Sequence, residues 1–176
     1  MAARDRAAFA EFVTARSGAL HRAAYLMVGE VGLAQDLVQE ALTKTYVAWP
    51  RLRDEGNAEA YTRRVITNTA ITWFRRKSWS SERASEHLPE RALAGHADHV
   101  SDRTALMSAL AQLPPRQRAA IVLRFYDDLT EAQTAAAMDC AVGTVKSQVA
   151  AGLATLRTLL GDAVDLDDLM PAGGAA

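Results

Sequence analysis

The chain contains 176 residues, of which 49% are hydrophobic and 23% are charged, and its formal net charge is −1. This composition excludes an intrinsically disordered chain and suffices for one or two small hydrophobic cores. No stretch approaches the roughly 20 uninterrupted apolar residues of a membrane span, and the first residues lack the apolar segment of a signal peptide. We therefore expect a soluble, cytoplasmic protein that does not bind a membrane.

The cysteine and histidine content argues against a metal site. Cys140 is the only cysteine, and no cysteine or histidine stands near it at the spacing of metal ligands. His96 and His99 could share one face of a helix, but a solvated pair in a linker is the simpler interpretation. The chain also lacks a glycine-rich phosphate loop and a nucleophile beside a base. The sequence therefore predicts no catalytic residue, metal, cofactor or small-molecule substrate, and a protein that is not an enzyme.

The apolar residues repeat with the period of a helix along the whole chain, and no segment alternates like a strand. We therefore predict an all-α protein. Glycine and proline residues separate the first three helices. The predicted helices span residues 4–28, 32–48, 57–77, 102–112, 115–126, 130–138 and 142–160.

Between Trp79 and Ser101 the helical pattern is replaced by Ser, Glu, His, Ala, Gly and Pro residues with few large apolar groups. Such a composition is typical of a flexible linker. The sequence thus predicts two small helical domains, at 1–79 and 102–161, joined by the linker 80–101 and followed by an acidic tail at 162–176.

Charge is distributed unevenly along the chain. Residues 1–80 carry 12 basic and 8 acidic side chains, a net charge of +4, whereas the last sixteen residues carry four acidic side chains and no basic one. The positive charge concentrates in a run with no acidic residue, which predicts a stripe facing phosphates. This run consists of Arg63, Arg64, Arg75, Arg76 and Lys77.

The predicted helix 32–48 has one acidic face. Asp36, Gln39 and Glu40 stand at positions i, i+3 and i+4, so their side chains share a face of the helix. Such a face suits a basic partner surface. The alternative is that this face, like most acidic helix faces, is only solvated.

The predicted helix 57–77 ends in the string Trp73-Phe74-Arg75-Arg76-Lys77. Cations follow phosphates while rings stack on unpaired bases, at about 1–3 kcal/mol per stacked base, so this mixture is typical of single-stranded DNA binding. The alternative is that Trp73 and Phe74 are ordinary core residues.

Residues 129–160 have the pattern of a helix-turn-helix. Thr130 and Gln133 form a capping box that begins a short helix, and the second helix has one apolar stripe, made of Val142, Val145, Val149, Leu153, Leu156 and Leu160. The opposite face is free to lie in a DNA major groove. It carries Thr144, Ser147, Gln148 and Ala151, with Lys146 at its flank. An amphipathic hairpin in a helical bundle would show the same spacing.

Three strings of the sequence resemble the extracytoplasmic-function group of bacterial sigma factors, with details closest to the SigE-like subfamily. Gln35–Leu42, with Trp49 downstream, resembles sigma region 2.2, and Ala60–Ala70 resembles regions 2.3 and 2.4. Gly143–Ser147, followed by Leu153, Leu156 and Arg157, resembles the helix-turn-helix of region 4. The two blocks, about 9–79 and 102–160, stand in the order and spacing of that family.

The resemblance implies a transcription initiation factor that binds core RNA polymerase and directs it to promoter DNA, and it allows an anti-sigma factor as a further partner. In the family, region 2.2 docks on the polymerase clamp helices, and the linker passes through the polymerase. Polymerase binding then falls on Asp36, Gln39, Glu40 and Lys44. Recognition of the −10 element falls on Arg64, Asn68, Trp73, Arg75, Arg76 and Lys77, and recognition of the −35 element falls on Thr144, Lys146, Ser147, Gln148 and Ala151.

Within this set, the resemblance places Asn68 in a pocket for a base flipped out of the promoter, and its amide has the donor and the acceptor that a base edge requires. The recognition helix departs from the family pattern. Ala141 replaces the usual hydroxyl N-cap, which costs about 0.5–2 kcal/mol where nothing compensates. Asp139 stands where the turn often has glycine, and Gln148 and Ala151 stand where relatives commonly carry arginine. A weaker hold on the −35 phosphates is implied.

Two other classes of function remain open from the residues alone. A stand-alone helix-turn-helix regulator would use residues 142–160 but would need a dimer to read paired half-sites. A protein that only binds other proteins, such as an adaptor or an anti-sigma factor, would leave the basic run of 63–77 unexplained.

Overall fold

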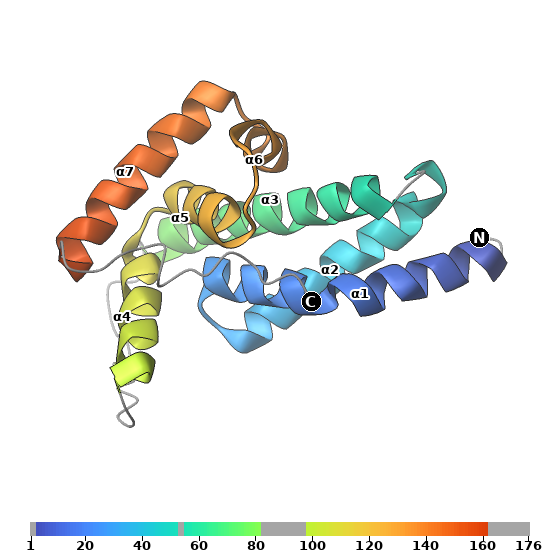
Figure 1. The fold of residues 1–176 in the computed structure, drawn as a ribbon, viewed down its shortest axis with the longest axis horizontal. Coiled ribbons are helices and arrows are strands. Elements are labelled where there is room, and N and C mark those ends of the chain that lie inside the picture. The colour runs from blue at the N-terminus through green and yellow to red at the C-terminus, as the bar shows by residue number, and fades with distance from the viewer. Residues whose placement is uncertain (1–2, 53–54, 82–97, 162–176) are drawn as a thin grey trace.

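The computed structural model describes residues 3–52, 55–81 and 98–161, and within these ranges every regular element is a helix (Figure 1). The N-terminal half comprises α1 (Ala3–Val28), α2 (Val31–Ala48), the 3-10 helix η1 (Trp49–Arg51) and α3 (Glu55–Ser81). The C-terminal half comprises α4 (Asp98–Gln112), α5 (Pro115–Ile121), the π-helical η2 (Val122–Tyr126), α6 (Glu131–Met138) and α7 (Val142–Leu160). The predicted all-α class is confirmed. None of the described helices is both long and apolar enough to cross a membrane.

Helices α3 and α4 extend into the segment predicted to be a linker. Helix α3 continues to Ser81 and α4 begins at Asp98, whereas the predicted limits were 77 and 102. Nothing in the sequence stops α3 at its predicted end, because the chain has no glycine or proline between Gly56 and Pro89. The rest of the predicted linker, with His96, and the predicted acidic tail lie outside the described residues.

The ends of several helices are defined by local hydrogen bonds. The Glu30 carboxylate caps α2 by accepting the backbone N–H groups of Gly32 at 2.8 Å and Leu33 at 3.0 Å. The predicted capping box is confirmed at α6, because the Gln133 N–H donates to Thr130 Oγ1 and the Thr130 N–H donates to Gln133 Oε1. Helix α7 begins after Ala141 without a side-chain cap, as predicted.

The helix predicted over 115–126 is confirmed in its limits, but its second half is π-helical and not α-helical. Helix α5 ends at Ile121, and the chain widens into the π-helical turn η2, where the Asp127 N–H donates to the Val122 carbonyl at 3.0 Å. The extra residue in the turn rotates the chain relative to a continuous α-helix. Val122 and Leu123 are both buried there, and the Asp127 carboxylate reaches α3.

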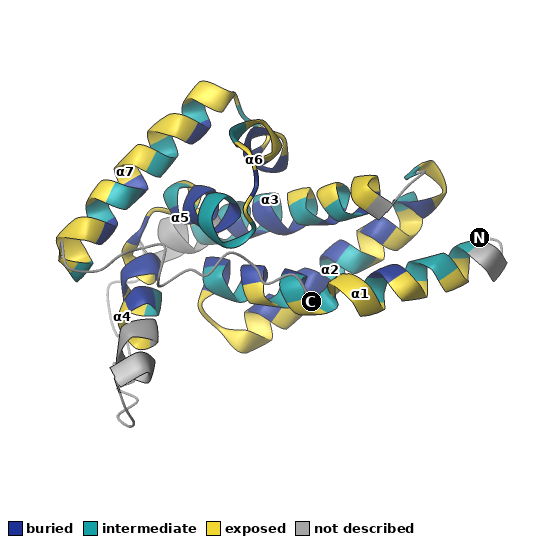
Figure 2. Cartoon of the chain, in the orientation of Figure 1, coloured by how far each residue is buried: buried dark blue, intermediate teal, exposed yellow. Residues whose placement is uncertain are grey.

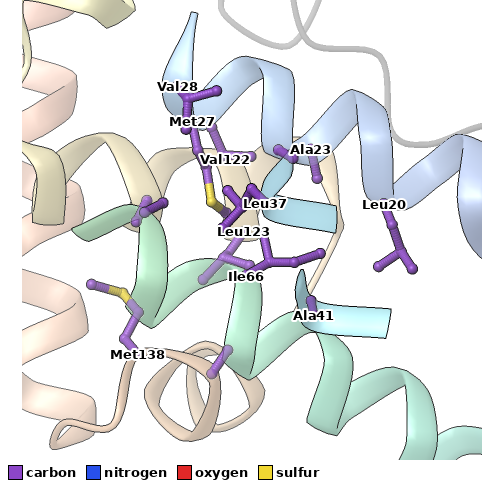
Figure 3. Close-up of a cluster of buried hydrophobic side chains, with 14 of the residues drawn as sticks. Leu20, Ala23, Met27, Val28, Leu37, Ala41, Ile66, Val122, Leu123 and Met138 are labelled. Atoms are coloured by element: carbon purple, nitrogen blue, oxygen red, sulfur yellow. The ribbon is translucent and has the colours of Figure 1, made fainter. Parts of the chain in front are cut away.

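The two halves share one hydrophobic core, which runs from α1, α2 and α3 into η2, α6 and α7. Figure 3 shows Leu37 and Ile66 of the N-terminal half beside Leu123 of the C-terminal half, with Met138 of α6 nearby. The sequence left one or two cores open. The structure instead combines this shared core with a small cluster in each half, built around Phe12 and Trp49 and around Leu110 and Leu156.

Helix α7 packs closely on α5 along the predicted apolar stripe, in which Val145 and Leu156 are fully buried. Gly152 makes this approach possible. A Cβ atom built on Gly152 would lie 3.0 Å from Cγ1 of Ile121 on α5. The outward side of α7 is exposed along most of its length (Figure 2).

Candidate polymerase and nucleic-acid interfaces

The acidic face of α2 is open to solvent over its whole length. Asp36, Gln39 and Lys44 are exposed and Glu40 is half-buried, with the Lys44 ammonium 2.7 Å from the Glu40 carboxylate. The opposite side of α2 packs into the protein through Ala34, Leu37, Val38, Ala41 and Thr45. The structure therefore places the four predicted polymerase-binding residues together on one exposed surface.

Two apolar residues of this face were not predicted from the sequence. Val47 is 76% exposed and Tyr46 is 40% exposed. Val47 follows Asp36 by eleven residues, or three helical turns, so it lies in line with the acidic side chains. The signal was present in the sequence as an apolar residue on the polar side of an otherwise regular stripe. We call the surface formed by Asp36, Gln39, Glu40, Thr43, Lys44, Tyr46 and Val47 the acidic face.

A polar groove of about 620 Å³ lies beside the acidic face, between α2 and α3. It brings together three of the predicted −10 residues, Arg64, Asn68 and Trp73. The lining of the groove also includes two residues of α2, Glu40 and Lys44, and four more residues of α3, Tyr61, Val65, Thr69 and Thr72. Two predicted polymerase-binding residues thus line the same groove as the predicted base-binding asparagine.

Two of the predicted −10 residues are also bonded to the C-terminal half. The Asn68 amide donates to the Arg64 carbonyl of its own helix at 3.0 Å and to the Ala137 carbonyl of α6 at 3.1 Å. The Arg64 guanidinium lies 3.1 Å from the carboxylate of Asp139, which follows α6. In this conformation, therefore, α6 and the turn after it occupy hydrogen-bonding groups that the sequence assigns to DNA.

The end of α3 combines core and surface residues. Trp73 and Phe74 are partly buried against the shared core, and the Arg118 guanidinium lies 4.9 Å from the centre of the Phe74 ring. Phe74 is thus a core residue, as the alternative interpretation held. Trp73 packs on the core and also lines the polar groove. Arg75 is exposed. Arg76 and Lys77 belong to α3, but their side chains lie outside the described residues.

The predicted −35 residues lie on the outer side of α7. Lys146, Ser147 and Ala151 are exposed, and Thr144 and Gln148 are half-exposed. The Lys146 ammonium is 3.5 Å from the Glu131 carboxylate of α6, and the Ser147 hydroxyl donates to a carbonyl of its own helix. This face is therefore polar but offers little positive charge.

A buried arginine and a buried aspartate join the two halves. Arg118 was expected among the arginines that contact DNA phosphates near α7, and its burial rules this role out in the described structure, whereas no role was predicted for Asp127. Arg118 is only 5% exposed, and its guanidinium donates to the carbonyls of Met27 in α1, Ala111 and Leu113 at distances of 2.6 to 3.2 Å. Burial lowers the pKa of Arg118 from its ordinary value. Asp127 accepts from Arg63 at 2.8 Å. Burial raises the pKa of Asp127, although the charge and hydrogen bond of Arg63 act against this shift.

Comparisons with known proteins assign both halves of the chain. The model of Sigma-70 region 2 matches residues 12–80, and the model of Sigma-70 region 4 matches residues 103–156. The RNA polymerase sigma-E factor of Streptomyces coelicolor is 41% identical over 159 residues, which cover 90% of this chain and 89% of that relative. The ECF RNA polymerase sigma factor SigW of Bacillus subtilis is 26% identical over 90% of this chain and 91% of its own length.

Among solved structures, the sigma factor RpoE of Bartonella quintana, in complex with the anti-sigma factor NepR, has a TM-score of 0.70 to this chain. The match covers 89% of this chain and 98% of the other at 24% identity, which shows a common fold.

The chain belongs to the sigma-70 family of RNA polymerase sigma factors. Within that family it is an extracytoplasmic-function sigma factor, and its 41% identity to a sigma-E factor agrees with the predicted SigE-like subfamily. The resemblance found in the sequence is thus confirmed. The roles of the individual surface residues stay predictions.

Proposed function

We propose that this sigma factor binds core RNA polymerase through the acidic face of α2, reads the −10 element with the polar groove of α3, and reads the −35 element with α7. The observation that carries this proposal is the shared groove. Glu40 and Lys44 of the acidic face line it together with Arg64 and Asn68. A polymerase docked on α2 would therefore hold an opened promoter strand directly beside the side chains suited to bind it.

The chemistry of the acidic face suits a protein partner with a basic surface. Specific interfaces combine apolar side chains at their centre with a polar rim, and complementary charge selects the partner. Val47 and Tyr46 supply the apolar part, and Asp36, Gln39 and Glu40 supply the acidic and hydrogen-bonding part. We therefore extend the polymerase-binding set to Tyr46 and Val47.

The polar groove suits an unpaired base. A base taken out of the duplex costs a few kcal/mol in lost stacking and pairing, which a polar pocket with a matching edge offsets. Asn68 offers such an edge, and Arg64, Arg75, Arg76 and Lys77 supply positive charge along α3. Trp73 lines the groove, and its aromatic ring is of the kind on which an unpaired base stacks.

We propose functional domains at 1–79 and 102–161, with 80–101 as the linker and 162–176 as an acidic tail, and a cytoplasmic protein that binds without catalysing a reaction. The family matches at 12–80 and 103–156 support the two domains. An anti-sigma factor is a further proposed partner, because RpoE of Bartonella quintana binds one.

Transcription from defined promoters tests the proposal. The purified chain is added to sigma-free core polymerase of Streptomyces coelicolor, together with a library of linear duplexes that vary at the −10 and −35 positions. Transcripts should begin downstream of paired motifs only when the chain is present. Asn68→Ala should reduce these transcripts and change the preference at one −10 base, while polymerase affinity stays unchanged.

Gln112→Ala is the matched control for Asn68→Ala, because Gln112 on α4 also donates to a carbonyl four residues earlier and lies away from the proposed surfaces. The control should behave like the wild type. Transcription that is independent of the chain, or an Asn68→Ala protein with normal activity and normal base preference, would contradict the assignment.

A further inference from the structure

A pocket of about 270 Å³ lies at the junction of α1, α2 and η2, apart from the surfaces assigned above. None of its residues belongs to the acidic face, to the polar groove or to the outer side of α7. Apolar groups make up most of its wall, and one arginine stands among them. Helix α1 supplies Arg22, Tyr25 and Leu26, α2 supplies Val31 and Ala34, and η2 supplies Tyr126.

The short turn between α1 and α2 forms one side of this pocket. Helix α1 ends at Val28 and α2 begins at Val31, so the last turn of one helix lies close to the first turn of the other. Val31 is 60% exposed although it is a large apolar residue, whereas Ala34, on the same face of α2, is buried and small. An apolar group bound in the pocket would therefore remove part of Val31 from water.

Arg22 is held at the pocket by a residue from the other half of the chain. Its Nε–H donates to the Tyr126 hydroxyl of η2 at 2.7 Å. No carboxylate within the described ranges pairs with Arg22, whereas Arg16 on the same helix pairs with Glu59 at 3.2 Å. The pocket therefore contains a positioned cation whose charge is not neutralised by a neighbouring acid of the described chain.

Gly18 allows the Arg22 guanidinium to lie against α1. The two residues are one helical turn apart, and a Cβ atom built on Gly18 would lie 3.3 Å from Nη1 of Arg22. Glycine inside a helix destabilises it relative to alanine, because the unfolded chain then has more backbone freedom to lose. At position 18, however, a larger residue would crowd the guanidinium. The glycine thus helps to keep the cation at the edge of the pocket.

The bond between Arg22 and Tyr126 leaves several hydrogen-bond donors unused beside the pocket. The Tyr126 oxygen accepts from Arg22, so its own O–H proton is free to donate. The Nη groups of Arg22 carry further N–H donors, which no acceptor within the described ranges occupies. A guanidinium and a hydroxyl side by side match the two oxygens of a carboxylate, and hydrogen bonds to such a charged acceptor are the strong ones.

The volume and the wall of the pocket define the rest of the ligand. An apolar cavity of about 150 Å³ suffices for a benzene molecule, so the larger volume of this pocket accommodates one ring or two fused rings. Tyr25 and Tyr126 bring aromatic rings to the wall. Because aromatic pairs are stabilised beyond the area that they bury, a flat aromatic body suits this wall better than an alkyl chain does.

We infer that this pocket binds a small aromatic carboxylate. The carboxylate binds Arg22 and the Tyr126 hydroxyl, and the aromatic body packs among the apolar groups of Leu26, Val31 and Ala34. An apolar pocket with a few convergent polar groups is the usual form of a small-molecule site in proteins. Since Arg22 belongs to the N-terminal half and Tyr126 to the C-terminal half, a single ligand contacts both halves of the chain.

Titration of the full chain with 2-naphthoate at neutral pH tests the site. Calorimetry should give a dissociation constant of about 0.1 mM, the order expected for a ligand of this size. Backbone amide NMR signals should shift at the pocket residues of α1, α2 and η2. The alcohol 2-naphthalenemethanol has the same rings without the charge and should bind at least about tenfold more weakly. Octanoate, with the same charge on a flexible alkyl chain, should also bind more weakly than 2-naphthoate.

Substitutions separate recognition of the carboxylate from recognition of the rings. Arg22→Met keeps an apolar stem and removes the cation, so it should weaken 2-naphthoate binding at least about tenfold and alcohol binding by less than about twofold. Tyr126→Phe removes only the hydroxyl and should weaken 2-naphthoate binding about fivefold. Val31→Ser reduces the apolar wall at an exposed position and should weaken both ligands about threefold. Arg6→Met, at an exposed position near the start of α1, is the matched control and should bind 2-naphthoate like the wild type.

Each outcome supports or overturns a defined part of the site. A wild-type chain that binds no 2-naphthoate at millimolar concentration, or binds the acid and the alcohol equally well, overturns the carboxylate site. A folded Arg22→Met protein with wild-type affinity does the same. If circular dichroism shows that Arg22→Met does not fold, unchanged affinity in both Tyr126→Phe and Val31→Ser overturns the site. Octanoate that binds more tightly than 2-naphthoate overturns the aromatic body. None of these measurements involves polymerase or promoter DNA, so they leave the proposed function untouched.

Discussion

The acidic face of α2 and the −10 surface of α3 lie side by side, but only the −10 surface is hydrogen-bonded to the C-terminal half. The acidic face carries exposed charged and apolar side chains, including Val47 at 76% exposure. On α3, Arg64 and Asn68 are bonded to the C-terminal half. A sequence motif thus identifies the groups that are able to bind a partner, whereas tertiary packing decides which of these groups a partner can reach first.

The largest expected effect comes from Arg118→Met, which removes the group that ties α1 and the C-terminal half together. The substitution leaves the carbonyls of Met27, Ala111 and Leu113 without their donor, at a cost of about 2–4 kcal/mol in the free energy of unfolding. Urea unfolding followed by circular dichroism measures this loss. Arg116→Met, at an exposed position of the same helix, is the control and should change stability by less than about 0.5 kcal/mol.

Charge reversal on the acidic face should weaken polymerase binding and leave the contacts between α3 and the C-terminal half intact. Asp36→Lys combined with Glu40→Lys reverses the charge that a basic partner surface would meet, so the dissociation constant for core polymerase should rise at least about tenfold. Fluorescence anisotropy with labelled chain measures it, and circular dichroism should show unchanged helicity. Glu11→Lys combined with Asp128→Lys, at two exposed positions outside α2, changes the net charge by the same amount and is the control. An unchanged dissociation constant in the double variant would remove α2 as the docking surface.

Asp127 should make the free energy of unfolding of the chain fall as the pH rises. Its pKa is raised in the folded chain by burial, so its contribution to stability is fully present below the ordinary pKa of aspartate and is lost as the pH rises through the raised value. Asp127→Asn keeps the shape and does not titrate. The stability of wild type relative to Asp127→Asn, measured by urea unfolding at several pH values, should therefore fall as the pH rises across this range.

The smallest effect concerns α7, a third surface that is exposed but weakly charged. Lys146 and Arg157 are its only basic residues, and Lys146 is already paired with Glu131. The free full-length chain should bind a −35 duplex weakly, with a slope of log affinity against log salt of only about 1–3. Lys146→Ala should reduce that slope by about 1. Tight, sequence-specific binding by the free chain at physiological salt would favour a stand-alone regulator.

Helix positions and the outer faces of α2 and α7 were predictable from the sequence because their signals are local. The capping box at Thr130 and Gln133, the apolar stripe of α7 and the i, i+3, i+4 spacing of Asp36, Gln39 and Glu40 all lie within a few turns of helix. The same holds for the missing cap at Ala141.

The shared core and the hydrogen bonds between the two halves were not predictable by the same reasoning. Arg118 binds the carbonyl of Met27, which is 91 residues away, and Asn68 binds that of Ala137, which is 69 residues away. No local pattern encodes such pairs. The π-helical turn was missed for a related reason. Residues 115–126 have a continuous helical pattern, whereas Val122 and Leu123 of the turn pack in the core that both halves share.

The shared core also has a consequence for the synthesis of the chain. Leu37 and Ile66 leave the ribosome before Leu123 and Met138, their partners in that core, have been made. Translation proceeds at about 5–20 residues per second, so several seconds pass before the C-terminal residues that cover α1, α2 and α3 have been made. During this interval the nascent N-terminal half displays an apolar surface that the finished protein conceals, and it therefore has the greatest need of a chaperone, or of an early polymerase contact, before the C-terminal half emerges.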